Sequence, residues 1–136
     1  MTLTPMPRAH TDALLARLRA DTGLSGVVFE GVVTDRPARY CTVFADQGRH
    51  ESERLDERQI QSAYRYVIHS IGSTPEQARW VGERVFAQLF DWRPVIPGRT
   101  CWRARHVGGQ AMQIDRDVSP PLWFVVDEFE LRSTPA

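Results

Sequence analysis

The chain has 136 residues, of which 42% are hydrophobic and 25% charged, and its formal net charge is zero. This length is typical of one domain with its own core, and the composition is that of an ordinary globular protein. The balanced charge gives no excess attraction to nucleic acid or to an anionic membrane surface. All the basic residues are arginines, which we attribute to a GC-rich genome rather than to function.

The N-terminal segment MTLTPMPRAH lacks the apolar core of a signal peptide, and no apolar run approaches the length of a membrane span. Cys41 and Cys101 lie far apart in the chain and belong to no CxxC or Cys/His spacing, so free buried thiols are the expected state. We therefore expect a protein made and used in a reducing cytoplasm, with no membrane partner.

The first part of the chain predicts one helix and two strands. Residues 7–22 place leucines on one face at helical spacing, with a proline in the first turn. Residues 27–33 are rich in β-branched side chains and form either a short strand or an extended connection. Residues 39–46 alternate as a strand does. Residues 47–58 are nearly all charged or polar, which predicts a solvated loop; the alternative is a projecting loop that becomes ordered on a partner.

The central stretch predicts a long strand followed directly by a helix. Residues 59–71 carry apolar side chains on both faces of a strand. Ser73 or Thr74 is expected to cap a helix whose first position is Pro75. One apolar stripe of this helix is expected to pack on the sheet: Ala78, Val81, Gly82, Val85, Phe86 and Leu89.

Trp80 falls roughly opposite this stripe, with Arg84 and Ala87 beside it. Two interpretations stay open. Either the first helix covers Trp80 within the subunit, or this helix face contacts another subunit, because Trp and Arg are enriched at the centres of interfaces.

The last part of the chain predicts three more strands. Residues 91–100 contain two prolines and a glycine and form a loop. Residues 100–107 alternate as a strand, the Gly-Gly pair at 108–109 predicts a hairpin turn, and QAMQIDRD returns as the partner strand. Residues 122–132 form the last strand, apolar on both faces, and residues 133–136 form a loose tail.

These elements predict a single α+β domain over residues 1–136. Its antiparallel or mixed sheet would have about four to five strands, with two helices packed on one face. An antiparallel sheet normally keeps its other face polar. Because two strands are apolar on both faces, either bulges reverse the alternation or another subunit covers the second face. We favour the second explanation.

The sequence offers no catalytic or metal-binding constellation. None of the histidines has a partner at a metal-ligand or catalytic spacing, and no nucleotide-binding or hydrolase motif is present. The run WRARH combines basic and aromatic residues, but neighbouring acids and the neutral total charge weaken it as a nucleic-acid signal. The sequence therefore predicts a protein that is not an enzyme and that uses no cofactor and no metal.

In the order of its elements, the chain resembles the tail terminator (tail completion) proteins of long-tailed bacteriophages. The resemblance is carried by the N-terminal helix PRAHTDALLARLRA, the charged loop 47–58, the strand and helix YRYVIHSIGSTPEQARWVGERVFAQL, and the closing WRARHVGGQAMQIDRDVSPPLWFVVDEFEL. It covers nearly the whole chain. The tryptophans at 80, 92, 102 and 123 match no position of that family.

This resemblance implies a virion protein at the head-proximal end of the tail, assembled in the host cytoplasm. Such a subunit would form a hexameric ring that caps the tail tube, ends its polymerisation and joins the head connector. Its partners would be further copies of itself, the tail tube protein and the head–tail connector, with DNA only as cargo in the lumen. The alternatives are another neck or minor tail component, or a small cytoplasmic ligand-binding or regulatory domain.

Closing a ring requires two different patches on each subunit. The candidate subunit interface combines one face of the second helix with a sheet face and consists of Tyr64, Tyr66, Trp80, Arg84, Ala87 and Phe124. The candidate contact with the tube or the lumen is the charged loop, through Arg49, Glu51, Glu53, Arg54, Asp56 and Arg58.

Overall fold

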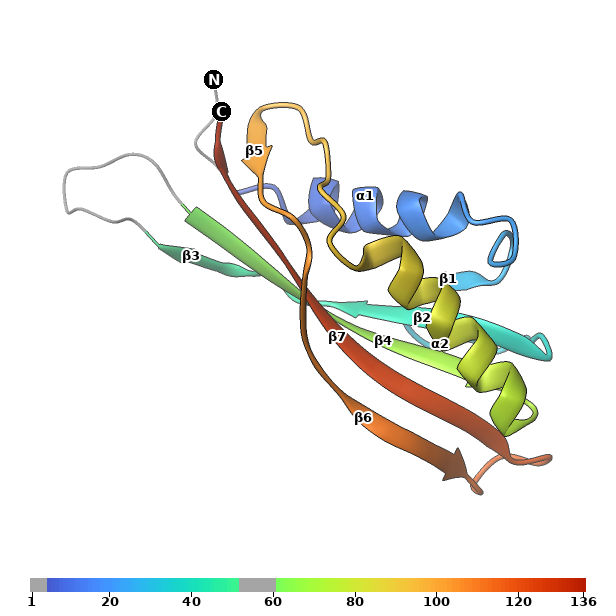
Figure 1. The fold of residues 1–136 in the computed structure, drawn as a ribbon. Coiled ribbons are helices and arrows are strands. Elements are labelled where there is room, and N and C mark those ends of the chain that lie inside the picture. The colour runs from blue at the N-terminus through green and yellow to red at the C-terminus, as the bar shows by residue number, and fades with distance from the viewer. Residues whose placement is uncertain (1–4, 52–60) are drawn as a thin grey trace.

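The computed structural model describes residues 5–51 and 61–136, in which two helices lie on one side of a seven-stranded mixed sheet (Figure 1). The elements in chain order are α1 (Pro7–Arg19), β1 (Val28–Glu30), β2 (Arg39–Ala45), β3 (Arg49–Glu51), β4 (Gln61–Gly72), α2 (Pro75–Leu89), β5 (Arg99–Cys101), β6 (Arg105–Asp115) and β7 (Leu122–Pro135). The predicted α+β class is confirmed, with more strands than expected.

Strands β4 and β7 form the centre of the sheet. The strand order is β1-β2-β4-β7-β5, while β3 also pairs with β4 and β6 with β7. Only β1 and β2 run parallel among these pairs. The β4–β7 ladder is unbroken from the pair Ser62 and Ser133 to the pair Gly72 and Trp123. Bulges between these two strands therefore do not explain why both are apolar on two faces.

The core lies between the sheet and the two helices. It is built from aliphatic residues of α1 and α2 packed on the large side chains of β4 and β7: Leu14, Leu15, Leu18, Val81, Val85, Leu89, Tyr64, Tyr66, Ile68, Phe129 and Leu131. The opposite side of the sheet, on which neither of the helices of the described residues lies (Figure 1), is called the open face below.

The start of α2 follows the predicted capping chemistry. The Thr74 side chain accepts a hydrogen bond from the Gln77 backbone N–H at 3.2 Å, and the Gln77 side chain accepts one from the Ser73 N–H at 3.1 Å. These reciprocal bonds satisfy donors that have no partner within the helix. Pro75 occupies the first helical turn, as expected.

The predicted hairpin turn at residues 108–109 is wrong. Gly108 and Gly109 lie inside β6, which pairs antiparallel with β7 along its length, and β5 pairs with β7 as well. A two-residue hairpin turn of the Gly-Gly kind needs positive φ angles, and neither glycine has one. Instead, the register shifts between His106 and Gly108. The glycine pair thus marks an irregularity in a strand.

The backbone of β7 lies so close to Gly109 that there is no room for a side chain, and replacing this glycine tests the pairing of β6 with β7. A Cβ atom at this position would lie 2.6 Å from the Val126 carbonyl oxygen. Gly109→Ala should therefore lower the free energy of unfolding by about 1–3 kcal/mol, the usual range for overpacking. Gly108→Ala is the matched control, because a Cβ there meets nothing within 4 Å. Equal denaturation midpoints for the two variants would contradict this reading of β6.

Two further predictions need correction. The C-terminal residues are not a loose tail, because β7 continues to Pro135, where it pairs with Arg99 of β5, and Ser133 is fully buried. The predicted loop 47–58 contains a strand, since Arg49–Glu51 forms β3 against the start of β4. In both places pairing partners distant in sequence impose strand structure on polar residues.

Candidate subunit interface

Aromatic side chains cover one half of the open face. The ring of His69 on β4 stacks on Phe124 of β7 with centroids 5.7 Å apart, and Phe44 of β2 meets His69 edge-on at 5.2 Å. Burial lowers the pKa of His69. Phe29 of β1 packs edge-on against Tyr40 at 5.9 Å. Phe44 remains 40% exposed, so this cluster is an apolar surface that the subunit covers incompletely.

The connection between β1 and β2 forms the rim of this aromatic half. A shallow groove of about 270 Å³ lies between it and the sheet, lined among others by Val32, Arg36, His69 and Phe124. The Thr42 hydroxyl donates to the Gly31 carbonyl, and the Gly31 N–H donates to the Val43 carbonyl at 3.0 Å. These bonds hold the start of the connection, while Val32 itself is 85% exposed.

Charged side chains of mixed sign cover the other half of the open face. Arg65 of β4 lies 3.9 Å from Glu128 and 4.0 Å from Glu130 of β7. The Arg132 Nε–H donates to Glu130 at 2.8 Å, and the Glu130 side chain is almost entirely buried. Arg49 of β3 lines the same hollow as Arg65 and Glu130. A surface with both signs of charge favours one registered contact over sliding encounters, because mispaired like charges repel.

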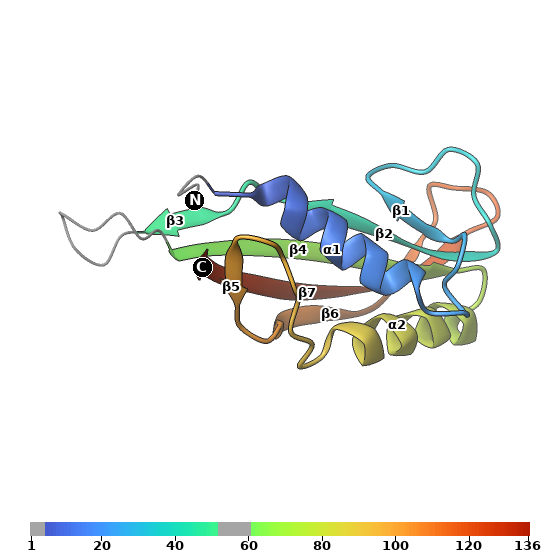
Figure 2. The same cartoon turned by 90° about the horizontal axis from the view of Figure 1, so that it is seen from above.

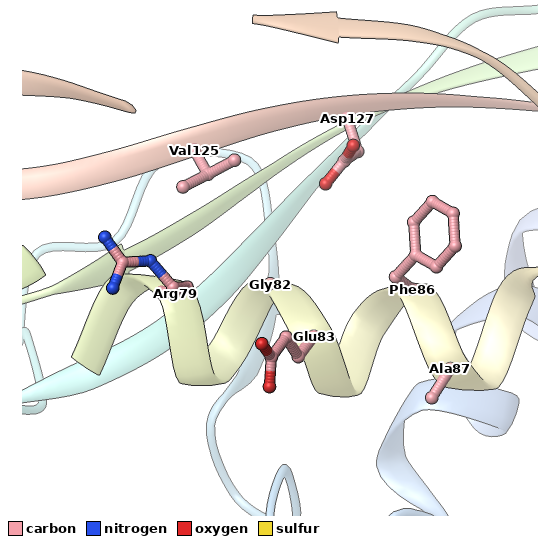
Figure 3. Close-up of a pocket in the computed structure, with 7 residues that line it drawn as sticks. All are labelled: Arg79, Gly82, Glu83, Phe86, Ala87, Val125 and Asp127. Atoms are coloured by element: carbon pink, nitrogen blue, oxygen red, sulfur yellow. The ribbon is translucent and has the colours of Figure 1, made fainter. Parts of the chain in front are cut away.

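A second hollow lies on the helix side of the sheet, between α2 and β7. This α2–β7 groove, of about 320 Å³, is lined by Arg79, Gly82, Glu83, Phe86, Ala87, Val125 and Asp127. Val125 and Asp127 project from β7 toward α2 (Figure 3). Its floor is apolar, because Gly82 presents no side chain and Phe86 belongs to an aromatic cluster with Phe90, His106 and Phe129. The charged side chains of Arg79 and Glu83 are exposed at the rim.

Within this groove Asp127 already has a partner. The His106 ring nitrogen Nε2 and the Asp127 carboxylate lie 2.9 Å apart. The His106 ring also meets Phe86 at 5.0 Å and Phe129 at 5.1 Å, so it is wedged between β6, β7 and α2. This pair satisfies the polar groups at the base of the groove and leaves its walls apolar.

The predicted interface residues of α2 divide between two environments. Trp80 is half-buried, with the Arg39 guanidinium 3.7 Å and the Arg84 guanidinium 4.7 Å from its ring centroid. Arg84 also pairs with Asp21 at 3.3 Å, in the segment that follows α1. These guanidinium groups, together with the core cluster against which Trp80 packs, cover part of its ring. Ala87 is exposed and lines the α2–β7 groove.

The prediction that Tyr64 and Tyr66 share an exposed sheet face with Phe124 is wrong. Both tyrosines are fully buried under α1: the Met6 N–H donates to the Tyr64 hydroxyl at 3.0 Å, and the Tyr66 hydroxyl lies 3.3 Å from Thr11 Oγ1. The β4–β7 register pairs Phe124 with Ile71, which places Phe124 on the open face. Only Phe124 of these three is available to a partner.

Of the charged-loop candidates, the structure places two. Arg49 and Glu51 lie exposed on β3 and line a hollow with Arg132 at the charged half of the open face. Glu53, Arg54, Asp56 and Arg58 lie outside the described residues.

Within residues 5–51 and 61–136, no cluster of His, Cys, Asp and Glu could hold a metal ion, and no helix is long and apolar enough to cross a membrane. Both cysteines are free, and burial raises the pKa of the Cys41 thiol to about 12. A thiol with so high a pKa is unreactive at neutral pH.

Sequence reasoning missed Val32 as a surface residue. VVFEGVV is rich in β-branched residues and was interpreted as one strand or extended connection, but β1 ends at Glu30. Gly31 has a φ of +76°, a left-handed conformation that breaks the strand. An isolated glycine inside a strand pattern is the signal that would have placed Val32 beyond the strand.

No family model matches this chain, and no curated protein matches it. Its fold is similar to that of a chain in a solved structure described as the virion of a native gene transfer agent particle. The TM-score is 0.64 and the identity 19%, over 91% of this chain and 93% of that one. A second solved structure has a TM-score of 0.58 at 12% identity, over 92% of this chain and 90% of the other. The likeness shows a shared fold across nearly the full length of each chain.

Proposed function

We propose that this chain is a structural virion protein of a tailed bacteriophage or phage-like particle, with no catalytic role. The observation that carries this proposal is the fold match to a chain of a gene transfer agent virion, which extends over nearly all of both chains. The open face supports it, because its half-exposed aromatic cluster and mixed charges suit a lasting contact with another protein.

We further propose that the subunit is a tail terminator. In this role it forms a hexameric ring at the head-proximal end of the tail, ends polymerisation of the tail tube and provides the surface that meets the head connector, with DNA passing through the lumen. A ring is built from heterologous contacts, in which one patch of each copy meets a different patch of the next. The subunit carries two unlike patches of this kind: the open face around Phe124, and the α2–β7 groove beside Ala87.

The proposed ring can be tested directly with purified protein. Light scattering at micromolar concentration should give a mass several times that of the 15.5 kDa subunit, and negative-stain images should show rings. Phe124→Asp should shift the protein toward the monomer while its far-ultraviolet circular dichroism stays unchanged, because Phe124 is only half-buried. Added to polymerising tube protein, the wild-type chain should shorten the tubes. A monomer at every concentration, with and without tube protein, would rule the ring out.

The ligand-binding alternative has less support from the same grooves. Small-molecule sites combine an apolar lining with a few polar groups aimed inward. In the α2–β7 groove Asp127 is engaged by His106, and Arg79 and Glu83 are exposed at the rim. That arrangement suits an apolar side chain from another protein better than a free metabolite.

A further inference from the structure

The β1–β2 connection carries an exposed apolar side chain, Val32, called the knob below, with charges beside it. Val32 is 85% exposed, and Asp35 and Arg36 follow it on the same connection, both exposed. The Arg36 Nε–H donates to the Val33 carbonyl at 3.4 Å, which keeps the connection folded back on itself. A single exposed aliphatic side chain is common on protein surfaces. Val32 differs because hydrogen bonds hold the segment around it and charges of both signs follow it in the chain.

The α2–β7 groove has the size and chemistry to receive such a knob. An apolar cavity of roughly 150 Å³ is enough for a benzene-sized group, and this groove has about 320 Å³. Its floor is apolar, and its rim presents Arg79 and Glu83. The knob brings Asp35 and Arg36, one charge of each sign, so both rim charges can meet an opposite charge.

The knob and the groove lie on opposite edges of the same subunit. The β1–β2 connection belongs to the β1 edge of the sheet, whereas the groove faces β7, toward the other edge. In the view from above, β1 and α2 lie along opposite sides of the molecule (Figure 2). A knob on one edge and a hole on the other give a contact that propagates from copy to copy in one direction, which is how rings are built.

We propose that Val32 of one copy inserts into the α2–β7 groove of the next copy. This inference rests on the proposed ring and names its contact. One side chain does not make a stable interface, which needs roughly 1,200 Å² of total buried surface. The surroundings of the knob and the groove provide the rest: the aromatic half of the open face on one copy and the exposed side of α2, including Ala87, on the next.

Disulfide trapping tests this contact on the full chain. In a Cys101→Ser background, the double variant Val32→Cys/Ala87→Cys has one thiol on the knob and one beside the groove, while buried Cys41 stays inert. Under a mild oxidant it should give a non-reducing gel ladder up to the full ring. Each single variant should stop at a covalent dimer, because it has only one reactive thiol.

The matched control is Val95→Cys/Ala87→Cys in the same background. Val95 is 91% exposed, comparable to Val32, but it lies between α2 and β5 and is not part of the knob. It should give no ladder beyond the dimer. A ladder of equal strength from both double variants would mean random collision and would overturn the inference.

The rim charges provide a second test. Asp35→Arg should weaken association about fivefold, because it replaces the proposed surface ion pair between Asp35 and Arg79 of the next copy by two like charges. Combining it with Arg79→Asp should restore part of that loss. If wild-type rings form but neither a ladder nor this rescue is seen, the knob contact is wrong and the ring stands. If the wild-type chain forms no ring and the Val32→Cys/Ala87→Cys variant gives no ladder, both proposals fail.

Discussion

Replacing Tyr64 with alanine is expected to lower the free energy of unfolding by about 3–5 kcal/mol, the range for truncating a large buried aromatic side chain. Tyr64 is fully buried and packs against the His10 ring, with ring centroids 4.2 Å apart and the ring planes tilted by 35°. Its hydroxyl accepts the Met6 N–H, and alanine would leave that donor without its partner. Because domains of this size are stable by about 5–15 kcal/mol, this one change should remove a large part of the total.

Phe124→Ala is the control that separates the two faces of the sheet. Phe124 is half-buried on the open face, so its truncation should cost about 1 kcal/mol in the same denaturation experiment. The order should invert for assembly: Phe124→Ala should weaken ring formation by a folded subunit, whereas Tyr64→Ala should lose rings only because the subunit unfolds. Equal losses of stability in both variants would contradict the assignment of these residues to opposite faces.

Acidification is expected to destabilise the subunit through His10. The His10 ring is fully buried and belongs to a chain of hydrogen bonds. Arg99 Nε–H donates to Ser133 Oγ at 3.0 Å, and Ser133 Oγ lies 2.8 Å from His10 Nε2. At the other side of the ring, His10 Nδ1 lies 2.6 Å from the Met6 carbonyl oxygen. With Nδ1 protonated toward Met6, Nε2 accepts from the serine. A second proton, on Nε2, would point at the hydroxyl hydrogen that Ser133 donates. The positive charge that it adds to the ring would also be repelled by the Arg99 guanidinium.

The sign of the pH effect follows from the pKa of His10. Burial lowers this pKa below 6.5, with smaller contributions in the same direction from the charges of Arg99 and His50, against a raising effect of the Met6 carbonyl. The folded state therefore binds fewer protons than the unfolded state. The contribution of neutral His10 to the free energy of unfolding should be fully present above about pH 6.5. It should decrease as the pH falls below that value, until the pH passes the lowered pKa of His10 in the folded state.

Urea denaturation at a series of pH values checks this expectation. His10→Gln should reduce the loss of stability between pH 7.5 and pH 5, because glutamine cannot gain the proton. His69→Gln is the comparison, since burial also lowers the pKa of His69 on the open face. If His10→Gln has the same slope of stability against pH as the wild type, the buried network is not the cause.

Local patterns were enough to predict most of the elements. A cap at Ser73 or Thr74, Pro75 in the first turn and one apolar stripe predicted α2 at its true start, since capping and helical period depend only on nearby residues. The alternation within β4 and β7 was also predicted correctly, because side chains of a strand point to opposite faces in turn. The same local reasoning failed at Gly108 and Gly109, where pairing with β7 overrides the turn preference of glycine.

What the sequence by itself determined is thus which residues share a face of each strand and each helix. It did not determine which of those faces meets the helices. That choice depends on the register between strands far apart in the chain, which pairs Ile71 with Phe124 and Tyr66 with Phe129. The tertiary structure alone therefore sends Tyr64 and Tyr66 into the core and leaves Phe124 on the open face. It also brings Ala87 beside β7 and leaves Val32 exposed at the other edge of the sheet.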